Sequence, residues 1–259
     1  MAVSDSTQRF SSRVNDYVLY RPGYPREIIE LLKSECGLTA DSVIADIASG
    51  TGIFTRLLLE NGNRVFGVEP NDDMRKAGEK FLSSYAKFTS VAGTAEATTL
   101  PDHSVDFVTA AQAAHWFDRE RARKEFVRIL RADGTPAGRG FTVLIWNERK
   151  VDTTPFLRAY EKLLLEFGTD YEDVRHERTT DAIDEFFAPS PFQKRVLAMN
   201  QVFDFEGLRG RLLSSSYAPA AGHPKHEPML RELQRIFDAY QENGRVSFDY
   251  DTRVYYGRL

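Results

Sequence analysis

The sequence has one cysteine, no long apolar run and no concentrated positive charge. Cys36 is the single cysteine among 259 residues, which excludes a disulfide within the chain. No apolar run approaches the roughly 20 residues that span a bilayer. The first ten residues lack the charged-then-apolar pattern of a signal peptide, and no basic block indicates a nucleic-acid surface. We therefore expect a cytoplasmic protein that binds neither nucleic acid nor membrane.

The sequence also contains no internal repeat and no low-complexity linker. Apolar residues make up 42% and charged residues 28%, with a net charge of −4, which is typical of a globular protein with a sizeable core. We expect residues 1–259 to form a single domain. His223, His226 and Glu227 have a metal-like spacing but lack a third strong ligand nearby, so we expect a helix start there and no metal site.

Apolar strands alternate with amphipathic helices over residues 26–147. The pattern predicts a doubly wound α/β fold in which helices cover both faces of a parallel sheet. The expected strands are 42–47, 64–68, 88–92, 105–110 and 141–146, and the expected helices are 25–35, 54–60, 72–82 and 119–130. Later segments predict helices at 153–167, 179–187, 205–214 and 226–242, and strands at 193–203 and 246–258. We interpret 148–190 as an insertion or lid.

The run from Val43 to Gly52 is the most informative stretch. A β-branched strand ends near Asp46, and small residues then lead into a helix, as in the nucleoside-binding corner of doubly wound folds. Helix-terminal amides at such a turn face a polar or anionic group. Thr55 stands where a dinucleotide fingerprint has its third glycine, which favours a nucleoside without phosphates. Asp46 could indirectly hold the ammonium of a ligand that ends in an amino acid.

Glu69 directly follows the second expected strand, beside this turn. A carboxylate there suits the two hydroxyls of a ribose. The alternative is a solvated loop carboxylate, which is disfavoured by the buried-looking strand that precedes it.

Four motifs in order resemble those of class I S-adenosylmethionine-dependent methyltransferases. They are DIASGTG at 46–52, GVEPNDDMRKAG at 67–78, AGTAEATTLPDHSVDFV at 92–108 and RILRADG at 128–134. The flanking segments RVNDYVLYRPGYP at 13–25, AAQAAHWFD at 110–118 and LIWNE at 144–148 are similar to the branch of trans-aconitate methyltransferase-like and related small-molecule enzymes. The resemblance implies a seven-stranded, mostly parallel sheet with an antiparallel C-terminal strand.

The resemblance also implies S-adenosylmethionine as cofactor and S-adenosylhomocysteine as its product. The cofactor-binding half would span about 26–147. The implied cofactor residues are Asp46, Ala48, Gly50, Gly52, Glu69, Pro70, Met74, Thr94, Ala95, Glu96, Ala111 and Gln112. Two of them depart from the family pattern: Ala48 replaces the first glycine of the turn, which is tolerable if its φ is negative, and Thr94 replaces an aspartate that would meet the adenine amino group.

The acceptor side is less defined. The residues 8–25 would form a cap, and the implied substrate wall consists of Tyr17, Tyr20, Arg21, Trp116, Trp146, Asn147, Arg209 and Tyr217. His115 could act as a general base or could pack within its loop, and packing is favoured. Arg21 could hold a carboxylate of the substrate or of the cofactor, or could lie on the surface. The two tyrosines could simply pack the N-terminal segment, and Trp146 could close the core.

The leading hypothesis is methyl transfer from S-adenosylmethionine to a small molecule that carries a carboxylate or hydroxyl group. One alternative is a non-catalytic or regulatory protein that binds the cofactor on the same fold. A nicotinamide-dependent oxidoreductase is a further alternative. The absence of the third glycine of the dinucleotide fingerprint disfavours it.

Overall fold

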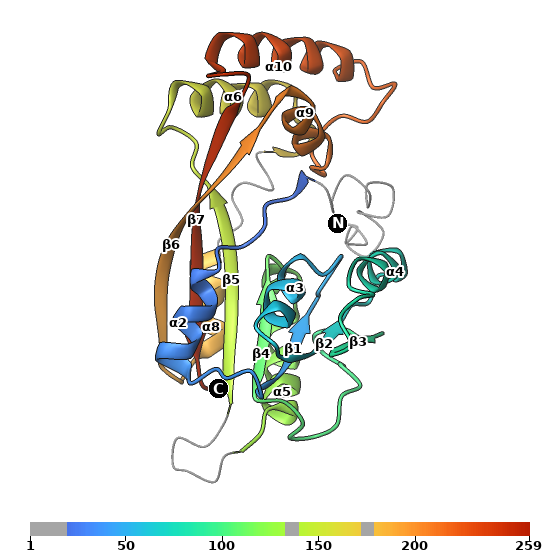
Figure 1. Cartoon of the computed structure of the whole chain (residues 1–259), viewed down its shortest axis with the longest axis vertical. Coiled ribbons are helices and arrows are strands. Elements are labelled where there is room, and N and C mark those ends of the chain that lie inside the picture. The colour runs from blue at the N-terminus through green and yellow to red at the C-terminus, as the bar shows by residue number, and fades with distance from the viewer. Residues whose placement is uncertain (1–19, 133–139, 172–178) are drawn as a thin grey trace.

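The structure is a computed structural model that describes residues 20–132, 140–171 and 179–259, with residues 179–182 described by their backbone alone. A seven-stranded sheet has the order β3-β2-β1-β4-β5-β7-β6 (Figure 1). The pairs among β1 to β5 are parallel, whereas β7 runs antiparallel to both β5 and β6. The expected fold class, including the antiparallel C-terminal strand, is confirmed.

The elements lie close to the positions that periodicity predicts. The strands are β1 Val43–Ile47, β2 Arg64–Val68, β3 Phe88–Val91, β4 Phe107–Ala111, β5 Phe141–Arg149, β6 Phe192–Phe203 and β7 Val246–Gly257. The helices are α2 Glu27–Cys36, α3 Ile53–Glu60, α4 Asp72–Phe81, the short η2 Ala114–Trp116, α5 Arg119–Ile129, α6 Pro155–Phe167, α8 Thr179–Phe187, α9 Phe205–Leu213 and α10 His226–Tyr240. None of the helices in the described ranges is both long and apolar enough to cross a membrane.

Side-chain caps fix where several helices begin. Asn71 accepts a hydrogen bond from the amide of Met74 at the start of α4, and Asp118 accepts one from Arg121 at the start of α5. Thr154 and Asp204 play the same part for α6 and α9. Such caps satisfy amide groups that the first helical turn leaves without partners.

Alternate residues of the strands bury against different helices. Ile44 of β1 packs in a cluster with α2 and α3, whereas Ala45 and Ile47 pack in a second cluster with α5 and α8. Because side chains of a strand alternate between faces, this arrangement gives the sheet an apolar core on both sides.

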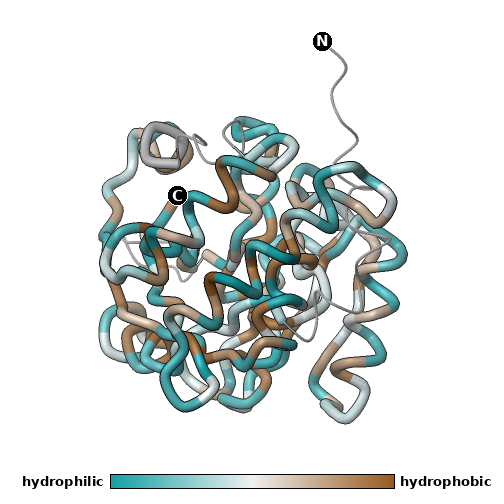
Figure 2. Tube along the Cα trace, turned by 90° about the horizontal axis from the view of Figure 1, so that it is seen from above, coloured by the Kyte–Doolittle hydropathy of each residue, from teal (hydrophilic) through white to brown (hydrophobic). Residues whose placement is uncertain are grey.

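A third cluster lies above the carboxyl ends of the parallel strands. There β5, β6 and β7 extend toward α6, α9 and α10 (Figure 1). The apolar sides of α6 and α10 meet in this cluster, which includes Leu157, Leu164, Leu233 and Phe248. Seen from above, the helices alternate hydrophilic and hydrophobic segments along the trace, as expected where one side faces a core (Figure 2).

The segment 148–190 contributes to two layers of the molecule in its described parts. Its first two residues belong to β5, and α6 packs on α10 in the upper layer. By contrast, Ile183, Phe186 and Phe187 of α8 pack against the sheet beside α5. The apolar side of α8 therefore buries in the main core, and the interpretation of 148–190 as a lid stays a prediction.

Three residues in the turn after β1 have a positive φ. They are Ala48 (φ 53°), Gly50 (φ 56°) and Gly52 (φ 84°). A Cβ on Gly52 would also lie 2.6 Å from Cδ1 of Leu82. The condition under which alanine would be tolerable here, a negative φ, is therefore not met, because the turn bends through left-handed conformations before α3 begins. An alanine in this conformation is strained.

Replacing Ala48 with glycine is expected to stabilise the protein. The left-handed conformation costs an alanine about 1–2 kcal/mol, and the greater freedom of glycine in the unfolded chain offsets part of the gain. The free energy of unfolding should rise by about 0.5–1 kcal/mol in urea denaturation. Gly52→Ala is the matched contrast and should lower it, because it adds both a positive-φ penalty and the contact with Leu82. A destabilised Ala48→Gly protein would contradict this account.

Candidate cofactor cleft and acceptor chamber

Two adjoining cavities lie at the carboxyl ends of β1, β2 and β4. Their volumes are about 230 and 250 Å³, and together we call them the cofactor cleft. The residues that line both are Ala48, Gly50, Ala111, Gln112 and Trp116. The edge is the one where doubly wound folds bind ligands. The two cavities meet at the turn after β1, so one elongated ligand could occupy both.

Glu69 links the turn after β1 to the segment that leads from β2 into α4. Its side chain is 7% exposed, and its Oε2 accepts a hydrogen bond from the amide of Gly50 (2.8 Å). Its Oε1 accepts one from the amide of Asn71 (2.8 Å). Burial raises the pKa of Glu69, against these hydrogen bonds. The carboxylate is thus fixed at the wall of the cleft and keeps further acceptor capacity for a ligand.

Asp46 lies at the floor of the smaller cavity. It is 1% exposed and accepts hydrogen bonds from the hydroxyls of Thr55 (2.6 Å) and Thr109 (2.8 Å). Burial raises its pKa to about 6, although both hydroxyls favour the ionised form. A buried carboxylate that lines a cavity in this way favours a cationic ligand group.

The larger cavity contains most of the residues expected to hold the adenosine end. They are Ala48, Gly50, Glu69, Pro70, Met74, Thr94, Ala95, Glu96, Ala111 and Gln112. Met74 lies against the turn, because its Cε is 3.5 Å from where a Cβ of Gly50 would stand. The hydroxyl of Thr94 accepts a hydrogen bond from the amide of Glu96 (3.3 Å). Glu96 in turn accepts one from the amide of Asp118 (2.9 Å), which ties this loop to α5.

The structure adds residues to the cleft that the sequence argument did not select. Asn71 and Phe117 line the larger cavity, and Ser49, Thr51 and Tyr24 line the smaller one. Thr51 is 1% exposed, and its Oγ1 has no hydrogen-bond partner among the residues described. Its position inside the small-residue turn was a signal that could have identified it.

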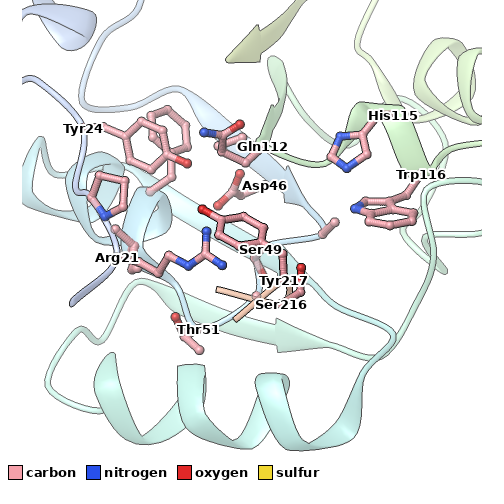
Figure 3. A pocket seen from close by; sticks show the side chains of 16 residues that line it. Arg21, Tyr24, Asp46, Ser49, Thr51, Gln112, His115, Trp116, Ser216 and Tyr217 are labelled. Atoms are coloured by element: carbon pink, nitrogen blue, oxygen red, sulfur yellow. The ribbon is translucent and has the colours of Figure 1, made fainter. Parts of the chain in front are cut away.

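His115 and Trp116 lie opposite Arg21 and Tyr24 in the smaller cavity (Figure 3). The rings of His115 and Trp116 are 4.6 Å apart at their centroids and inclined by 45°. Burial lowers the pKa of His115 to about 4, so its imidazole is neutral at physiological pH. Trp116 is 42% exposed and lines both cavities.

A third cavity, the acceptor chamber, adjoins the cofactor cleft on the side of β5 and β7. Its volume is about 640 Å³. Arg21, Gln112 and Tyr217 line both the chamber and the smaller cavity of the cleft. Asn147 also lines the chamber, and its Nδ2 donates a hydrogen bond to the carbonyl of Gly23 (2.8 Å). Three of the expected acceptor residues, Arg21, Asn147 and Tyr217, thus come together.

Other expected acceptor residues lie elsewhere. Trp146 packs in the core against Tyr255, and Tyr20 packs on α9 where Gly210 leaves room for its ring. Tyr17 and most of the expected cap at 8–25 lie outside the described residues. Gly52 does not line either cavity of the cleft and shapes the turn instead.

Arg209 does not reach the chamber. Its side chain is 45% exposed and pairs with Glu206 on the same helix (3.6 Å). Arg211, two residues further along α9, is instead buried and lines the chamber. The helical spacing from Leu208 to Arg211 and Leu212, all buried, was the signal that could have identified it.

The comparisons with known proteins agree with this geometry. The sequence profile of a methyltransferase domain family matches residues 45–137. An uncharacterised methyltransferase of Mycobacterium tuberculosis (strain H37Rv) is 30% identical over 254 residues, which cover 96% of this chain and 94% of that protein. A methyltransferase-like protein of Schizosaccharomyces pombe is 33% identical over 174 residues, and the match spans 66% of this chain and 63% of that protein's length.

Two solved structures show the same fold. A type II methyltransferase from Anaeromyxobacter dehalogenans superposes with a TM-score of 0.68 and 21% identity, over 92% of this chain and 98% of that one. Haemonchus contortus phosphoethanolamine N-methyltransferase 2, in complex with phosphomonomethylethanolamine and S-adenosylhomocysteine, superposes with a TM-score of 0.52 and 14% identity, over 97% of this chain and 58% of that one. With the mycobacterial relative matched over nearly its whole length, the chain belongs to the class I S-adenosylmethionine-dependent methyltransferases.

Proposed function

We propose that the protein transfers a methyl group from S-adenosylmethionine to a small-molecule acceptor that carries a carboxylate or hydroxyl group. The observation that carries this proposal is the continuity of the cavities. Arg21, Gln112 and Tyr217 border both the cofactor cleft and the acceptor chamber. A donor in the cleft and an acceptor in the chamber would therefore meet at this shared boundary, where proximity and alignment accelerate the transfer.

The residues of the cleft fit this cofactor. Glu69 has acceptor capacity left for two ribose hydroxyls after binding the amides of Gly50 and Asn71. Pro70 and Met74 would flank the adenine in the larger cavity. In the smaller cavity, the Asp46 carboxylate suits the α-ammonium. The Oγ1 of Thr51, which has no hydrogen-bond partner within the described ranges, suits the α-carboxylate.

The cofactor supplies an electrophilic methyl group on its sulfonium, so the protein mainly has to position the two reactants. Gln112 is well placed for this. Its backbone has a positive φ (58°), its amide donates to the carbonyl of Ile145 (2.8 Å), and its Nε2 donates to the carbonyl of Asn147 (2.9 Å). These bonds fix the loop after β4 at the boundary of cleft and chamber.

The site is poorly suited to removing a proton from the acceptor. A hydroxyl acceptor must lose a proton, whereas a carboxylate needs no base. His115 has a pKa of about 4, and a base of that strength accepts a proton from a hydroxyl poorly at neutral pH. This favours a carboxylate acceptor and a packing role for His115.

A non-catalytic cofactor-binding protein is the second hypothesis. Side chains that filled the acceptor chamber would favour this hypothesis. The chamber of about 640 Å³ beside the cleft argues instead for a second reactant. Membership of the methyltransferase family argues against a nicotinamide-dependent oxidoreductase.

Glu69→Ala is expected to weaken S-adenosylhomocysteine binding by roughly ten- to a hundredfold. The variant loses the ribose acceptor and leaves the amides of Gly50 and Asn71 without a partner, and charge-assisted hydrogen bonds of this kind are worth about 1.5–3 kcal/mol. Isothermal calorimetry measures the change. Asp73→Asn, an exposed position on α4 away from the cleft, should bind as the wild type does. Unchanged affinity in Glu69→Ala would refute the assignment.

S-adenosylhomocysteine affinity is expected to fall as the pH drops below about 6. The pKa of Asp46 is about 6 without ligand, and an ammonium partner favours the ionised carboxylate, so binding at lower pH requires loss of a proton. The affinity should decline by up to tenfold per pH unit there. Asp46→Asn should bind more weakly at neutral pH and lose this component of the pH dependence. A flat wild-type profile between about pH 5 and pH 8 would contradict the role of Asp46.

His115 is expected to titrate near pH 4 in the folded protein. Burial disfavours its charged form, so the imidazole signals in an NMR titration should stay those of the neutral ring well below the ordinary pKa of about 6.5. The signal is assigned by its loss in His115→Asn. A measured pKa near 7 would instead restore His115 as a competent general base.

A further inference from the structure

The acceptor chamber is lined by an excess of positive charge. Its cationic side chains are Arg21, Arg149, Lys150, Arg211 and Arg253, and its acidic ones are Glu148, Asp152 and Asp251. The chamber lies between the ends of β5 and β7 and the helix α9. Such a lining favours an anionic occupant.

Three of these cations have a carboxylate partner. Lys150 pairs with Asp251 (3.0 Å), and Arg253 pairs with Glu148 across the strands β5 and β7. Arg149 pairs with Glu161 of α6, which also accepts a hydrogen bond from the hydroxyl of Tyr171 (2.8 Å). These pairs build the walls of the chamber and leave their charges locally neutralised.

Arg211 differs from these three. It is 8% exposed, and among the described residues no carboxylate lies within ion-pair distance of its guanidinium. Its Nη1 donates to Oγ of Ser215 (3.0 Å), and its Nε is buried with no hydrogen-bond partner in the described parts of the chain. Its other near neighbours are phenols: Tyr250 makes a side-chain hydrogen bond with the guanidinium, and Tyr217 lies close by.

A guanidinium stays charged at any physiological pH, and burying a charge without a counter-charge is costly. The hydroxyls around Arg211 supply hydrogen bonds but no carboxylate counter-charge. The missing partner is therefore expected from a ligand, and the planar donors of arginine match a carboxylate or a phosphate. The Nε, which has no hydrogen-bond partner among the described residues, supplies one of those donors on the wall of the chamber.

We propose that the methyl acceptor carries a compact oxyanion, a carboxylate or phosphate group, that binds the guanidinium of Arg211 in the acceptor chamber. This inference rests on the proposed function. Arg211 lines the chamber but not the cofactor cleft, whereas Arg21, Gln112 and Tyr217 line both. The anion that binds Arg211, which we call the anion handle, thus lies away from the methyl donor. The group that accepts the methyl is a second group of the same molecule, at the shared boundary.

The test measures anion binding to the full-length protein saturated with S-adenosylhomocysteine. Calorimetric titrations use succinate, inorganic phosphate and uncharged succinamide as probes. Wild-type protein should bind succinate or phosphate, and the tighter of the two identifies the oxyanion, whereas succinamide should not bind. Absence of binding by both anions would overturn the proposal.

Variants of α9 assign the binding to one side chain. Arg211→Gln should weaken anion binding about tenfold or more, as expected for the loss of a charge-assisted pair. Arg209→Gln removes an equal charge from the exposed side of the same helix and should bind as the wild type does. Equal anion affinity in Arg211→Gln and wild type would refute the site. If Arg211→Gln fails to fold, anion binding is measured in Arg211→Lys instead. This variant keeps the charge but loses the planar fork of donors, so its anion affinity should also be lower than that of the wild type.

Two further readouts separate a ligand site from a structural arginine. In buffer without the anions, Arg211→Met should melt at or above the wild-type temperature, because it removes an unpaired buried charge. A large drop in melting temperature would mark Arg211 as structural. A tyrosinate absorbance at neutral pH that disappears in Tyr217→Phe would show that Tyr217 already supplies the counter-charge, and would also overturn the proposal.

The controls keep this inference distinct from the proposed function. Arg211→Gln should bind S-adenosylhomocysteine as tightly as the wild type, because Arg211 does not line the cleft. If the wild type fails to bind S-adenosylhomocysteine, the proposed function fails. If the wild type binds it but binds neither anion, only the anion handle fails.

Discussion

The cofactor cleft depends on the carboxylate of Glu69. One of its oxygens holds the amide of Gly50 in the turn after β1, and the other holds the amide of Asn71 at the start of α4. The turn passes through three positive-φ residues, of which Gly50 and Gly52 adopt this conformation readily and Ala48 is strained. Glu69 anchors this turn, and the same carboxylate remains available to a ligand. The ligand site and the local fold are therefore coupled through one side chain.

The acceptor chamber depends on a different set of contacts. The strands β5 and β7 extend beyond the parallel strands, and Arg149 near the end of β5 pairs with Glu161 of α6. Arg149 also donates a hydrogen bond to the hydroxyl of Tyr171 (3.0 Å), and its guanidinium lies over the ring of Tyr160 (5.2 Å to the centroid). These contacts join the sheet to the upper helices, so the chamber is built where the two layers meet.

The sequence predicted the elements well because both faces of the sheet are buried. The nearly continuous apolar run of β1 and the helical spacing in α10 leave clear patterns, and Glu69 could be placed because it directly follows a strand. Long-range packing is not encoded in such local patterns. The sequence left the sign of φ at Ala48 open, and although alanine prefers a negative φ, the turn has a positive one there. The choice of Arg209 over Arg211 failed because the orientation of α9 depends on the upper helices.

The two halves of the site carry opposite charge, and this difference bears on the reaction. Asp46 and Glu69 give the cleft two carboxylates, which suit the positive sulfonium and ammonium of the proposed cofactor, whereas Arg211 gives the chamber a positive wall. An anion bound directly to a guanidinium is a weaker nucleophile, because its charge is already neutralised. The proposed handle at Arg211 would separate this binding from the chemistry. Its binding energy would then orient a second group at Gln112 and Tyr217, where alignment rather than a strong base would account for the transfer.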